Sequence, residues 1–291
     1  MRAAAIFGLG SSEKNLQPFR KEKSVEWLIG LPSQSSAADT ILVFGGDGTI
    51  HRHLAQLVRL ALPVLIVPCG SGNDFARALG LRNVRDSLAA WKDFCSHRTK
   101  AKPIDLGLIT PLDPSSQAPS YFCCVGGVGL DGEISRRANR LPRWLRGHGG
   151  YALSLPGALL GLAAWKTKIL VPESDGWQVH RDRPTVLAAF ANTPVYGGGM
   201  RIAPQAQLDD GKLDICLVTD VNRFKLFCLF PTVYFGRHLR LPEVEYFQAE
   251  RIRVLPETPL DVYADGEYVC RTPVEVSLCR NALQVLVRSA A

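Results

Sequence analysis

The 291-residue sequence lacks any run of about 18 uninterrupted apolar residues, so we expect no helix that spans a bilayer. The apolar N-terminal stretch, Ala3 to Leu9, is too short for a signal peptide, and no small-residue cleavage motif precedes Glu13. The eight cysteines show no C-x-x-C spacing and are too sparse for a disulfide framework. We therefore expect a cytoplasmic protein whose cysteines are reduced core residues.

The sequence also lacks a nucleic-acid-binding motif, although its net charge is +7 and its isoelectric point is about 9.1. Its basic residues form only short clusters, such as that from Arg136 to Arg146, with no aromatic stacking platform between them. We expect no nucleic-acid partner. A solvated basic face and attraction to a nucleotide or to an anionic membrane surface both explain the charge.

The first part of the chain, residues 1–105, alternates short apolar runs with helical patterns, which predicts an α/β nucleotide-binding domain with a parallel sheet. The predicted strands are Ala3–Phe7, Val25–Ile29, Ile41–Phe44 and Val64–Val67, and the predicted helices are His51–Arg59 and Asp74–Leu79. Ligands bind outside the carboxyl ends of such strands. The two glycine-rich turns that follow Phe44 and Val67 therefore belong to the same crevice.

Residues 106–291 change to many short strand patterns separated by turn residues, which predicts a mainly antiparallel β-sandwich domain for a lipid substrate. The predicted strands are Tyr121–Val125, Lys168–Val171, Val186–Ala191, Leu213–Val218, Arg251–Leu255, Leu260–Ala264, Tyr268–Arg271, Val274–Leu278 and Leu283–Val287. Two apolar, helix-length stretches interrupt them, Tyr151–Trp165 and Phe224–Phe235, and each contains a proline that bends or ends a helix. Buried helices, the lining of an acyl pocket and a surface on the bilayer all fit these stretches.

The first glycine-rich turn, Gly45-Gly-Asp-Gly-Thr49, has the composition of a phosphate-binding loop. Glycines let several backbone N–H groups converge on an anion, and we expect Thr49 to cap the helix that follows. Asp47 is unusual in such a loop, because a carboxylate repels phosphate unless a divalent cation lies between them. The combination predicts a site for a metal nucleotide.

The second turn, Pro68-Cys-Gly-Ser-Gly-Asn-Asp74, supplies two glycines for backbone approach, the Ser71 hydroxyl, and Asn73 and Asp74 at the start of a helix. Taken alone it fits a simple turn with an Asn/Asp cap equally well. Neither turn has the lysine of a Walker A loop or the spacing of a dinucleotide-binding motif.

The two turns, followed by Phe75-Ala-Arg77, resemble the diacylglycerol kinase catalytic domain family, which includes bacterial lipid kinases and sphingosine kinases, with NAD kinases more distantly similar. The resemblance continues in order through most of the chain. The further matching segments are Ile104–Gly107, Val128–Asp131, Gly197–Gly199, Ala203-Pro204, Asp210–Asp214 and Asp265–Glu267. The family usually has an Asn-Pro-x-Ser-Gly segment after its first strand, whereas this chain has Phe7–Ser12 there.

The resemblance implies phosphorylation of a lipid hydroxyl by ATP and Mg²⁺, in a cleft between an α/β domain and a β-sandwich. It implies nucleotide binding by the two turns, at positions Gly45, Gly46, Asp47, Gly48, Thr49, Gly70, Ser71, Gly72 and Asn73. Asp47, Asp74 and Asp105 correspond to acidic positions tied to the catalytic metal and its water network, and Glu267 to the proton acceptor. Asp210 corresponds to a second metal position, where the carbonyls of Gln207 and Lys212 complete the site.

Two of these positions also fit a purely structural role. Asp265-Gly-Glu267 fits a hairpin turn between Leu260–Ala264 and Tyr268–Arg271, and a turn is also a good platform for a base. The segment from Asp210 to Asp214 fits a turn at least as well as a metal site, because hard cations need several oxygen ligands.

The sequence thus predicts a cytoplasmic, peripherally membrane-associated lipid kinase that phosphorylates diacylglycerol or a similar lipid with a single hydroxyl. Its predicted partners are ATP, the lipid and an anionic membrane surface, and the sequence does not define an oligomeric state. One alternative is a kinase for a soluble substrate such as NAD. Another is a non-catalytic nucleotide or lipid sensor, which the altered Phe7–Ser12 loop motivates.

Overall fold

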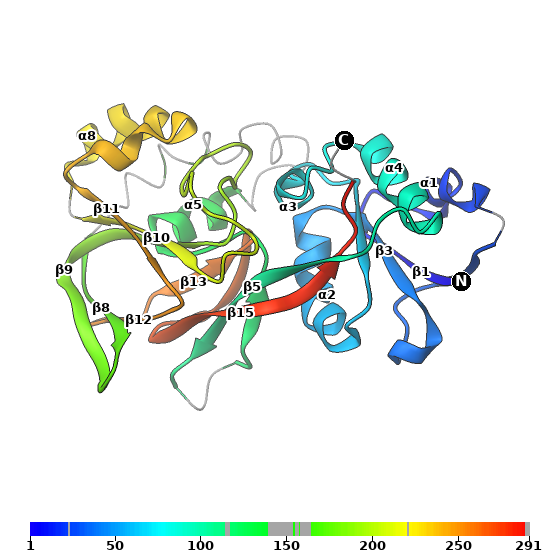
Figure 1. The fold of residues 1–291 in the computed structure, drawn as a ribbon. Coiled ribbons are helices and arrows are strands. Elements are labelled where there is room, and N and C mark those ends of the chain that lie inside the picture. Colours follow the sequence, from blue (N-terminus) through cyan, green and yellow to red (C-terminus); the bar gives the residue numbers. More distant parts are fainter. Residues whose placement is uncertain are drawn as a thin grey trace. The chain divides into compact units, whose positions relative to one another are not determined.

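The computed structural model describes residues 1–22, 24–113, 117–138, 154, 157, 164–219 and 221–288. The chain forms two compact units, one of Met1–Asp105 with Arg280–Ala291 and the other of Leu106–Cys279 (Figure 1). Two strands, β5 (Lys102–Pro111) and β15 (Val274–Val285), pass from one unit into the other. The sequence pattern places residues 106–291 in the second domain, but the C-terminal segment from Arg280 belongs to the first unit.

The first unit contains the predicted parallel sheet. Its strands are β1 (Arg2–Phe7), β2 (Glu26–Ile29), β3 (Thr40–Gly45) and β4 (Val64–Pro68), in the order β2-β1-β3-β4. Every residue of β3 and β4 is buried, as expected for central strands covered on both faces. The C-terminal end of β15 extends this sheet, because Val285 pairs in parallel with Val64.

The helices of the first unit follow its strands. They are α1 (Glu13–Leu16), α2 (Asp47–Leu60), α3 (Asp74–Ala78) and α4 (Val84–Cys95), with short 3₁₀ turns at Phe19–Lys21 and Ser35–Ala37. Helix α4 is not among the predicted elements, and Asn83 caps it by accepting N–H bonds from Arg85 and Asp86. Trp91 of α4 is fully buried and donates its indole N–H to the carbonyl of Phe19.

The second unit is antiparallel, as predicted. Its strands, besides β5 and β15, are β6 (Ser120–Phe122), β7 (Val125–Gly129), β8 (Trp165–Glu173), β9 (Gly176–Ala191), β10 (Leu213–Thr219), β11 (Val244–Ala249), β12 (Arg251–Pro256), β13 (Asp261–Ala264) and β14 (Glu267–Arg271). Side chains from most of these strands form one buried cluster, with Phe122 and Phe190 among its largest members.

Four features of the second unit differ from the sequence prediction. The expected strand Tyr121–Val125 is two strands separated by Cys123 and Cys124, and the expected strands Val274–Leu278 and Leu283–Val287 fall in one strand, β15, which ends at Val285. Strand β11 and helix α5 (Leu130–Ala138) were not predicted.

The apolar stretch Phe224–Phe235 is helical, as expected. Helix α8 (Arg223–Leu229) leads into 3₁₀ turns at Phe230–Phe235 and Arg237–Arg240, and the α-helix ends before Pro231. Most of the other apolar stretch, Tyr151–Trp165, lies outside the described residues, as do several arginines of the basic cluster.

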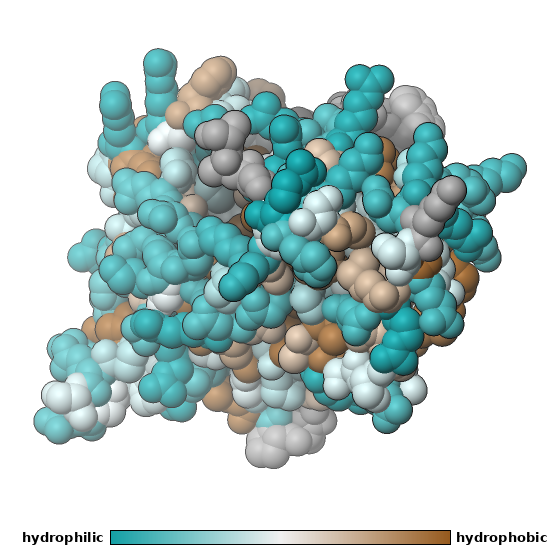
Figure 2. Space-filling view, turned by 45° about the vertical axis from the view of Figure 1, so that its right-hand side comes forward, coloured by the Kyte–Doolittle hydropathy of each residue, from teal (hydrophilic) through white to brown (hydrophobic). Residues whose placement is uncertain are grey.

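The eight cysteines are all free thiols. Four are buried and three are half-buried, but Cys228 on α8 is exposed, so the expectation of core cysteines fails at this position. Within the described residues, no helix is both long enough and apolar enough to cross a membrane. On the face shown in Figure 2, hydrophilic residues cover most of the surface and hydrophobic ones gather in small groups between them.

Candidate active site

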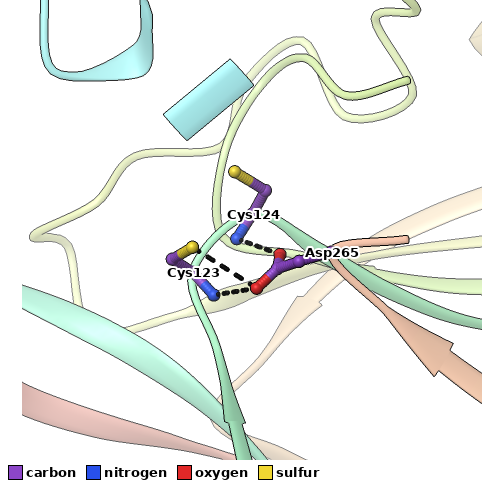
Figure 3. A group of neighbouring side chains, drawn as sticks. All are labelled: Cys123, Cys124 and Asp265. Atoms are coloured by element: carbon purple, nitrogen blue, oxygen red, sulfur yellow. Dashed lines mark hydrogen bonds between the residues drawn. The ribbon is translucent and has the colours of Figure 1, made fainter. Parts of the chain in front are cut away.

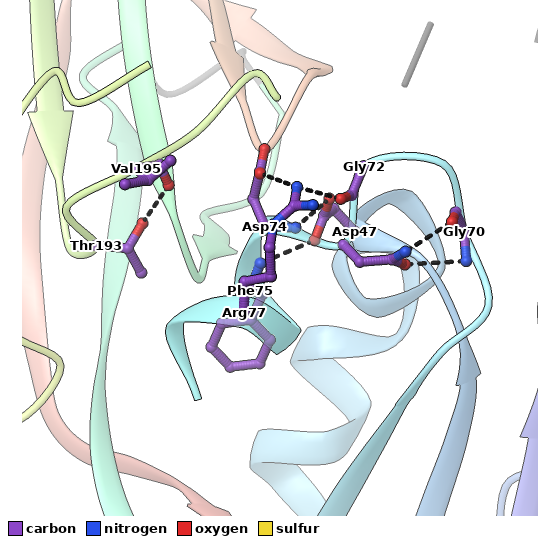
Figure 4. A network of polar contacts seen from close by, with 9 residues as sticks. Asp47, Gly70, Gly72, Asp74, Phe75, Arg77, Thr193 and Val195 are labelled. Carbon is purple, nitrogen blue, oxygen red and sulfur yellow. Dashed lines mark hydrogen bonds and ion pairs between the residues drawn. The ribbon is translucent and has the colours of Figure 1, made fainter. Parts of the chain in front are cut away.

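The carboxylate of Asp47 joins the two glycine-rich loops of the first unit. Its Oδ2 accepts the backbone N–H of Asp74 at 3.0 Å and its Oδ1 accepts that of Phe75 at 3.1 Å (Figure 4). These are N–H groups at the start of α3, which have no partner within their own helix. Asp47, the first residue of α2, therefore caps the helix that follows the next strand, and its negative charge lies at the favourable end of both helix dipoles.

The two loops approach each other at Gly46 and Gly70. A Cβ on Gly46 would lie 2.9 Å from the Gly70 Cα, and a Cβ on Gly70 would lie 2.9 Å from the Gly46 nitrogen. The side-chain amide of Asn73 fixes the second loop, because its Oδ1 accepts the Gly70 N–H at 2.9 Å and its Nδ2 donates to the Gly70 carbonyl at 2.6 Å. Both glycines are thus required by backbone-to-backbone contact.

Thr49 does not cap α2, contrary to the sequence prediction. The helix begins at Asp47, with Gly46 at the N-cap position, so Gly48 and Thr49 lie within its first turn. The Thr49 side chain instead fills the space beside two glycines, and a Cβ on Gly45 or Gly8 would lie 2.6 or 2.9 Å from the Thr49 Cβ. The Phe7–Ser12 loop therefore packs against the first glycine-rich turn.

Asp74 is buried and forms an ion pair with Arg77 at 2.6 Å. The Arg77 guanidinium also donates to the carbonyl of Gly72, which ties α3 to the second loop. Apart from its neighbours in the chain, a Cβ on Gly72 would meet one atom within 4 Å among the described residues, the Asp47 Oδ2 at 2.8 Å. The space beside Gly72 is therefore open and bordered by a carboxylate oxygen, while Ser71 is exposed on the same loop.

Asp105 lies at the end of the first unit's N-terminal segment and is 3% exposed. Its Oδ1 accepts the backbone N–H of Asn281 at 2.7 Å. Asn281 has a φ of 53°, in the left-handed region that asparagine tolerates better than most residues. Asp105 thus holds the C-terminal strand in place.

Glu267 is exposed at the start of β14, directly after the turn of the β13–β14 hairpin. The turn residues, Asp265 and Gly266, have φ values of 51° and 83°, as expected for a two-residue hairpin connection. The structural interpretation of Asp265-Gly-Glu267 is therefore confirmed, and the turn carries the proposed base.

The hairpin turn is anchored by the side chain of Asp265. Its carboxylate accepts the backbone N–H groups of Cys123 at 2.9 Å and Cys124 at 2.8 Å, and the Cys123 thiol lies 3.3 Å away (Figure 3). The backbone N–H of Asp265 donates to the carbonyl of Val125. The connection between β6 and β7 therefore fixes the residue that stands two positions before Glu267.

The predicted second metal position is a turn. The Asp210 Oδ1 accepts the backbone N–H of Lys212 at 3.0 Å, and Gly211 between them has a φ of 75°. Nearby, Asp214 is fully buried and accepts hydrogen bonds from Tyr246 and Gln248. Burial raises the pKa of the Asp214 carboxyl, and these hydrogen bonds partly oppose the change.

The second unit also contains a small apolar cavity of about 60 Å³. Its walls come from α5, β9, β10, α8 and the 3₁₀ turns that follow, and its polar members are His238 and Glu243. His238 is 3% exposed, its Nε2 lies 3.1 Å from the carbonyl of Ile202, and its Nδ1 has no partner among the described residues. Burial lowers the pKa of His238, and the hydrogen bond to Ile202 opposes this change.

Three residues on which this arrangement depends, Arg77, Asp265 and His238, have no role in the sequence prediction. The spacing of Asp74 and Arg77 could have indicated the ion pair of Arg77, because residues three positions apart on a helix are neighbours on one face. The other two depend on contacts between distant segments, which local sequence does not reveal.

A parallel α/β unit with two apposed glycine-rich loops, followed by an antiparallel β unit, defines the fold class of the NAD kinases and diacylglycerol kinases. Residues 16–109 match the diacylglycerol kinase catalytic domain, and residues 125–287 match the YegS C-terminal NAD kinase beta sandwich-like domain. The chain belongs to the diacylglycerol kinase and YegS-like family of lipid kinases.

Individual relatives agree with this assignment. The chain is 34% identical to a diacylglycerol kinase of Mycobacterium tuberculosis over 87% of this chain and 78% of the relative, and 28% identical to one of Bacillus subtilis over 87% and 79%. A crystal structure of a Bacillus anthracis diacylglycerol kinase aligns with a TM-score of 0.68 and 21% identity, over 99% of this chain and 97% of that one. An NAD kinase of Archaeoglobus fulgidus, solved with ATP, shares the fold more distantly, with a TM-score of 0.52 and 14% identity over 98% and 92%.

Proposed function

We propose that the protein transfers the γ-phosphoryl group of ATP to the hydroxyl of diacylglycerol or of a similar lipid with one hydroxyl. The observation that carries this proposal is the contact between the loops at Gly46 and Gly70, which Asp47 reinforces with two hydrogen bonds to the start of α3. Such an arrangement suits phosphoryl transfer, which depends mainly on positioning and on neutralising charge. The names of the relatives support the lipid substrate.

The nucleotide binds, in this proposal, along the two loops of the first unit. The residues that contact it are Gly45, Gly46, Gly48, Thr49, Gly70, Ser71, Gly72 and Asn73. The backbone N–H groups at the start of α2, a helix of 14 residues, attract the phosphates, and the glycines allow them to approach closely. The related NAD kinase that was solved with ATP supports ATP as the phosphoryl donor for this fold.

Mg²⁺ is the proposed metal, and the donor set fits it. Asp47 and Asp74 supply hard carboxylate oxygens, and the open space beside Gly72 borders the Asp47 Oδ2. Asp47 and Asp74 would hold the ion, with Asp105 in its water network. When bound, Mg²⁺ neutralises charge on the phosphoryl oxygens. We also propose that Asp210 and the carbonyls of Gln207 and Lys212 bind a second cation, which takes no part in the reaction.

Glu267 is the proposed general base. Its carboxylate takes the proton of the lipid hydroxyl. At the same time the hydroxyl oxygen bonds to the γ-phosphorus, and the bond between this phosphorus and the bridging oxygen breaks, which leaves ADP. A positioned base of this kind contributes about 100- to 10,000-fold in rate. Exposure of Glu267 on a hairpin turn suits this role, because solvent-exposed turns can present a side chain to a substrate.

The apolar cavity of the second unit is the proposed site for part of an acyl chain. Its walls are aliphatic and aromatic apart from His238 and Glu243, and its volume of about 60 Å³ suits a few methylene groups and is too small for a dinucleotide such as NAD. A protein that takes its substrate from a bilayer must meet the membrane surface. Peripheral association with an anionic membrane is therefore part of the proposal.

The test is a phosphoryl-transfer assay with Mg²⁺, labelled ATP and a panel of lipids, with NAD as a soluble acceptor. We expect transfer to diacylglycerol, a loss of about 100-fold or more in kcat for Glu267→Gln, and unchanged activity for the matched control Glu257→Gln, which is also an exposed glutamate of the second unit. Transfer to NAD instead would overturn the lipid assignment. Thermal stabilisation by Mg-ATP without turnover on any acceptor would identify a sensor.

A further inference from the structure

The segment from Asn222 to Leu241 places three phenylalanine side chains in solvent. Phe224 is 76% exposed, Phe227 is 50% exposed and Phe235 is 72% exposed. Phe224 and Phe227 are three residues apart on α8, so they lie on the same helix face. Phe235 ends the 3₁₀ turn that follows α8. Large exposed aromatic side chains on two consecutive elements indicate an interaction surface. We call these three side chains the phenylalanine patch.

The opposite side of the same segment is also apolar. Leu226, Phe230 and Val233 line the cavity of the second unit, whereas the phenylalanine patch points away from it into solvent. A surface helix of a soluble protein normally has one polar face. This segment instead separates an apolar cavity from an apolar outer surface.

The charges of the segment have one sign. Between Asn222 and Leu241 the sequence contains four lysine and arginine residues and no aspartate or glutamate. Lys225 is paired with Glu243, which lies just beyond the segment, while Arg237 and Arg240 are exposed. Aromatic side chains flanked by cations complement a bilayer with anionic head groups, because the rings enter the acyl boundary and the cations meet the phosphates. A second copy of the chain would bring like charges together.

We propose that the phenylalanine patch, with Arg237 and Arg240, is the surface by which the protein docks on an anionic lipid bilayer. This inference rests on the proposed function, because docking by this surface brings the cavity proposed for the acyl chain to the membrane. The rest of the element stays folded against the cavity while the three rings enter the lipid.

The test measures binding of the full chain to phosphatidylcholine vesicles with and without phosphatidylglycerol. Replacing the patch (F224S, F227S and F235S together) is expected to weaken binding to the anionic vesicles by about 10-fold or more. A matched control replaces three exposed apolar residues elsewhere, L28S, I29S and V179S, and is expected to bind like wild type. The double variant R237Q and R240Q is expected to lose about fivefold in vesicle affinity for each charge removed, and only with the anionic vesicles.

A probe on Cys228 locates the contact. Cys228 is the exposed thiol of α8 among the described cysteines, so an environment-sensitive fluorophore attached there is expected to shift to shorter wavelength with anionic vesicles. Labelled C228S reports the background from the half-buried thiols. No shift, together with wild-type binding by the patch variant, would overturn the docking surface. So would light scattering that shows a dimer in wild type and a monomer in the patch variant.

The result is separable from the proposed function. A water-soluble, short-chain diacylglycerol does not require vesicle docking, so the patch variant is expected to phosphorylate it at the wild-type rate. If wild type phosphorylates no lipid in any form, the proposed function fails, whatever the vesicles show. If wild type is active and the patch variant docks and turns over on vesicles like wild type, the docking inference alone fails.

Discussion

The Asp47 carboxylate accepts the backbone N–H of Asp74 at 3.0 Å, so the first residue of one helix caps the start of another. The two residues belong to different glycine-rich loops, and each loop follows its own strand. The proposed nucleotide site and the fold of the first unit therefore depend on the same carboxylate. Substitutions at Asp47 should affect both, and the two effects can be separated.

Asp47→Ala is expected to destabilise the protein by about 1 to 2 kcal/mol, because two N–H groups at the start of α3 lose their acceptor. Asp47→Asn keeps one acceptor oxygen and should lose less stability. Both variants should lose phosphoryl transfer, since neither has the charge to hold a cation. Urea denaturation beside the lipid assay measures the two effects. Wild-type stability in Asp47→Ala would contradict the capping role.

Gly70→Ala is expected to prevent nucleotide binding, because the new Cβ would lie 2.9 Å from the Gly46 nitrogen and would push the two loops apart. The loss should be visible as the absence of thermal stabilisation by Mg-ATP. Gly80→Ala is the control. Its φ of 76° makes alanine unfavourable by about 1 kcal/mol, but, apart from its neighbours in the chain, its Cβ would meet no atom of the described residues within 4 Å. That variant should be less stable and still respond to Mg-ATP.

Asp265→Ala is expected to cost about 1 to 3 kcal/mol of stability, because the backbone N–H groups of Cys123 and Cys124 lose their acceptor. It should also lower kcat, since the hairpin that carries Glu267 is no longer held. Asp265→Asn keeps one oxygen and suits the left-handed backbone at this position, so it should recover most of the stability. In contrast, Glu267→Gln should leave the urea midpoint unchanged. Equal stability of the two Asp265 variants would show that the anchor is unimportant.

Much of the fold follows from local sequence. Strands β3 and β4 are apolar runs that end in glycine-rich turns. Continuous apolar runs of this kind are typical of strands that are buried on both faces of a parallel sheet. The Asp265-Gly266 pair predicts its hairpin because these residues tolerate a positive φ. In both cases the preference of a short segment and the tertiary structure agree.

The remainder depends on long-range contacts. Thr49 fits a helix cap by its residue type, but the N-cap is Gly46, three residues earlier, and the first helical residue, Asp47, is held by the start of α3. The C-terminal segment has the pattern of another strand of the second domain. It joins the first unit, where Asp105 accepts the Asn281 N–H across 176 positions in sequence. No pattern within one segment specifies such a partner.

His238 should make the stability of the second unit depend on pH. Burial lowers its pKa below the usual value of 6.5, so the folded state binds fewer protons than the unfolded state once the pH falls below about 6.5. Stability is therefore expected to be lost as the pH falls from 6.5 through the lowered pKa, at a limiting slope of about 1.4 kcal/mol per pH unit.

His238→Gln retains an amide that can donate to the carbonyl of Ile202 and has no proton to gain. Urea midpoints of the two proteins, measured from pH 7 down to pH 5, should diverge toward the acid side. The pKa of His180 is also lowered, but it is present in both proteins and cancels in the difference. Parallel curves would show that the His238 ring titrates without cost to the fold.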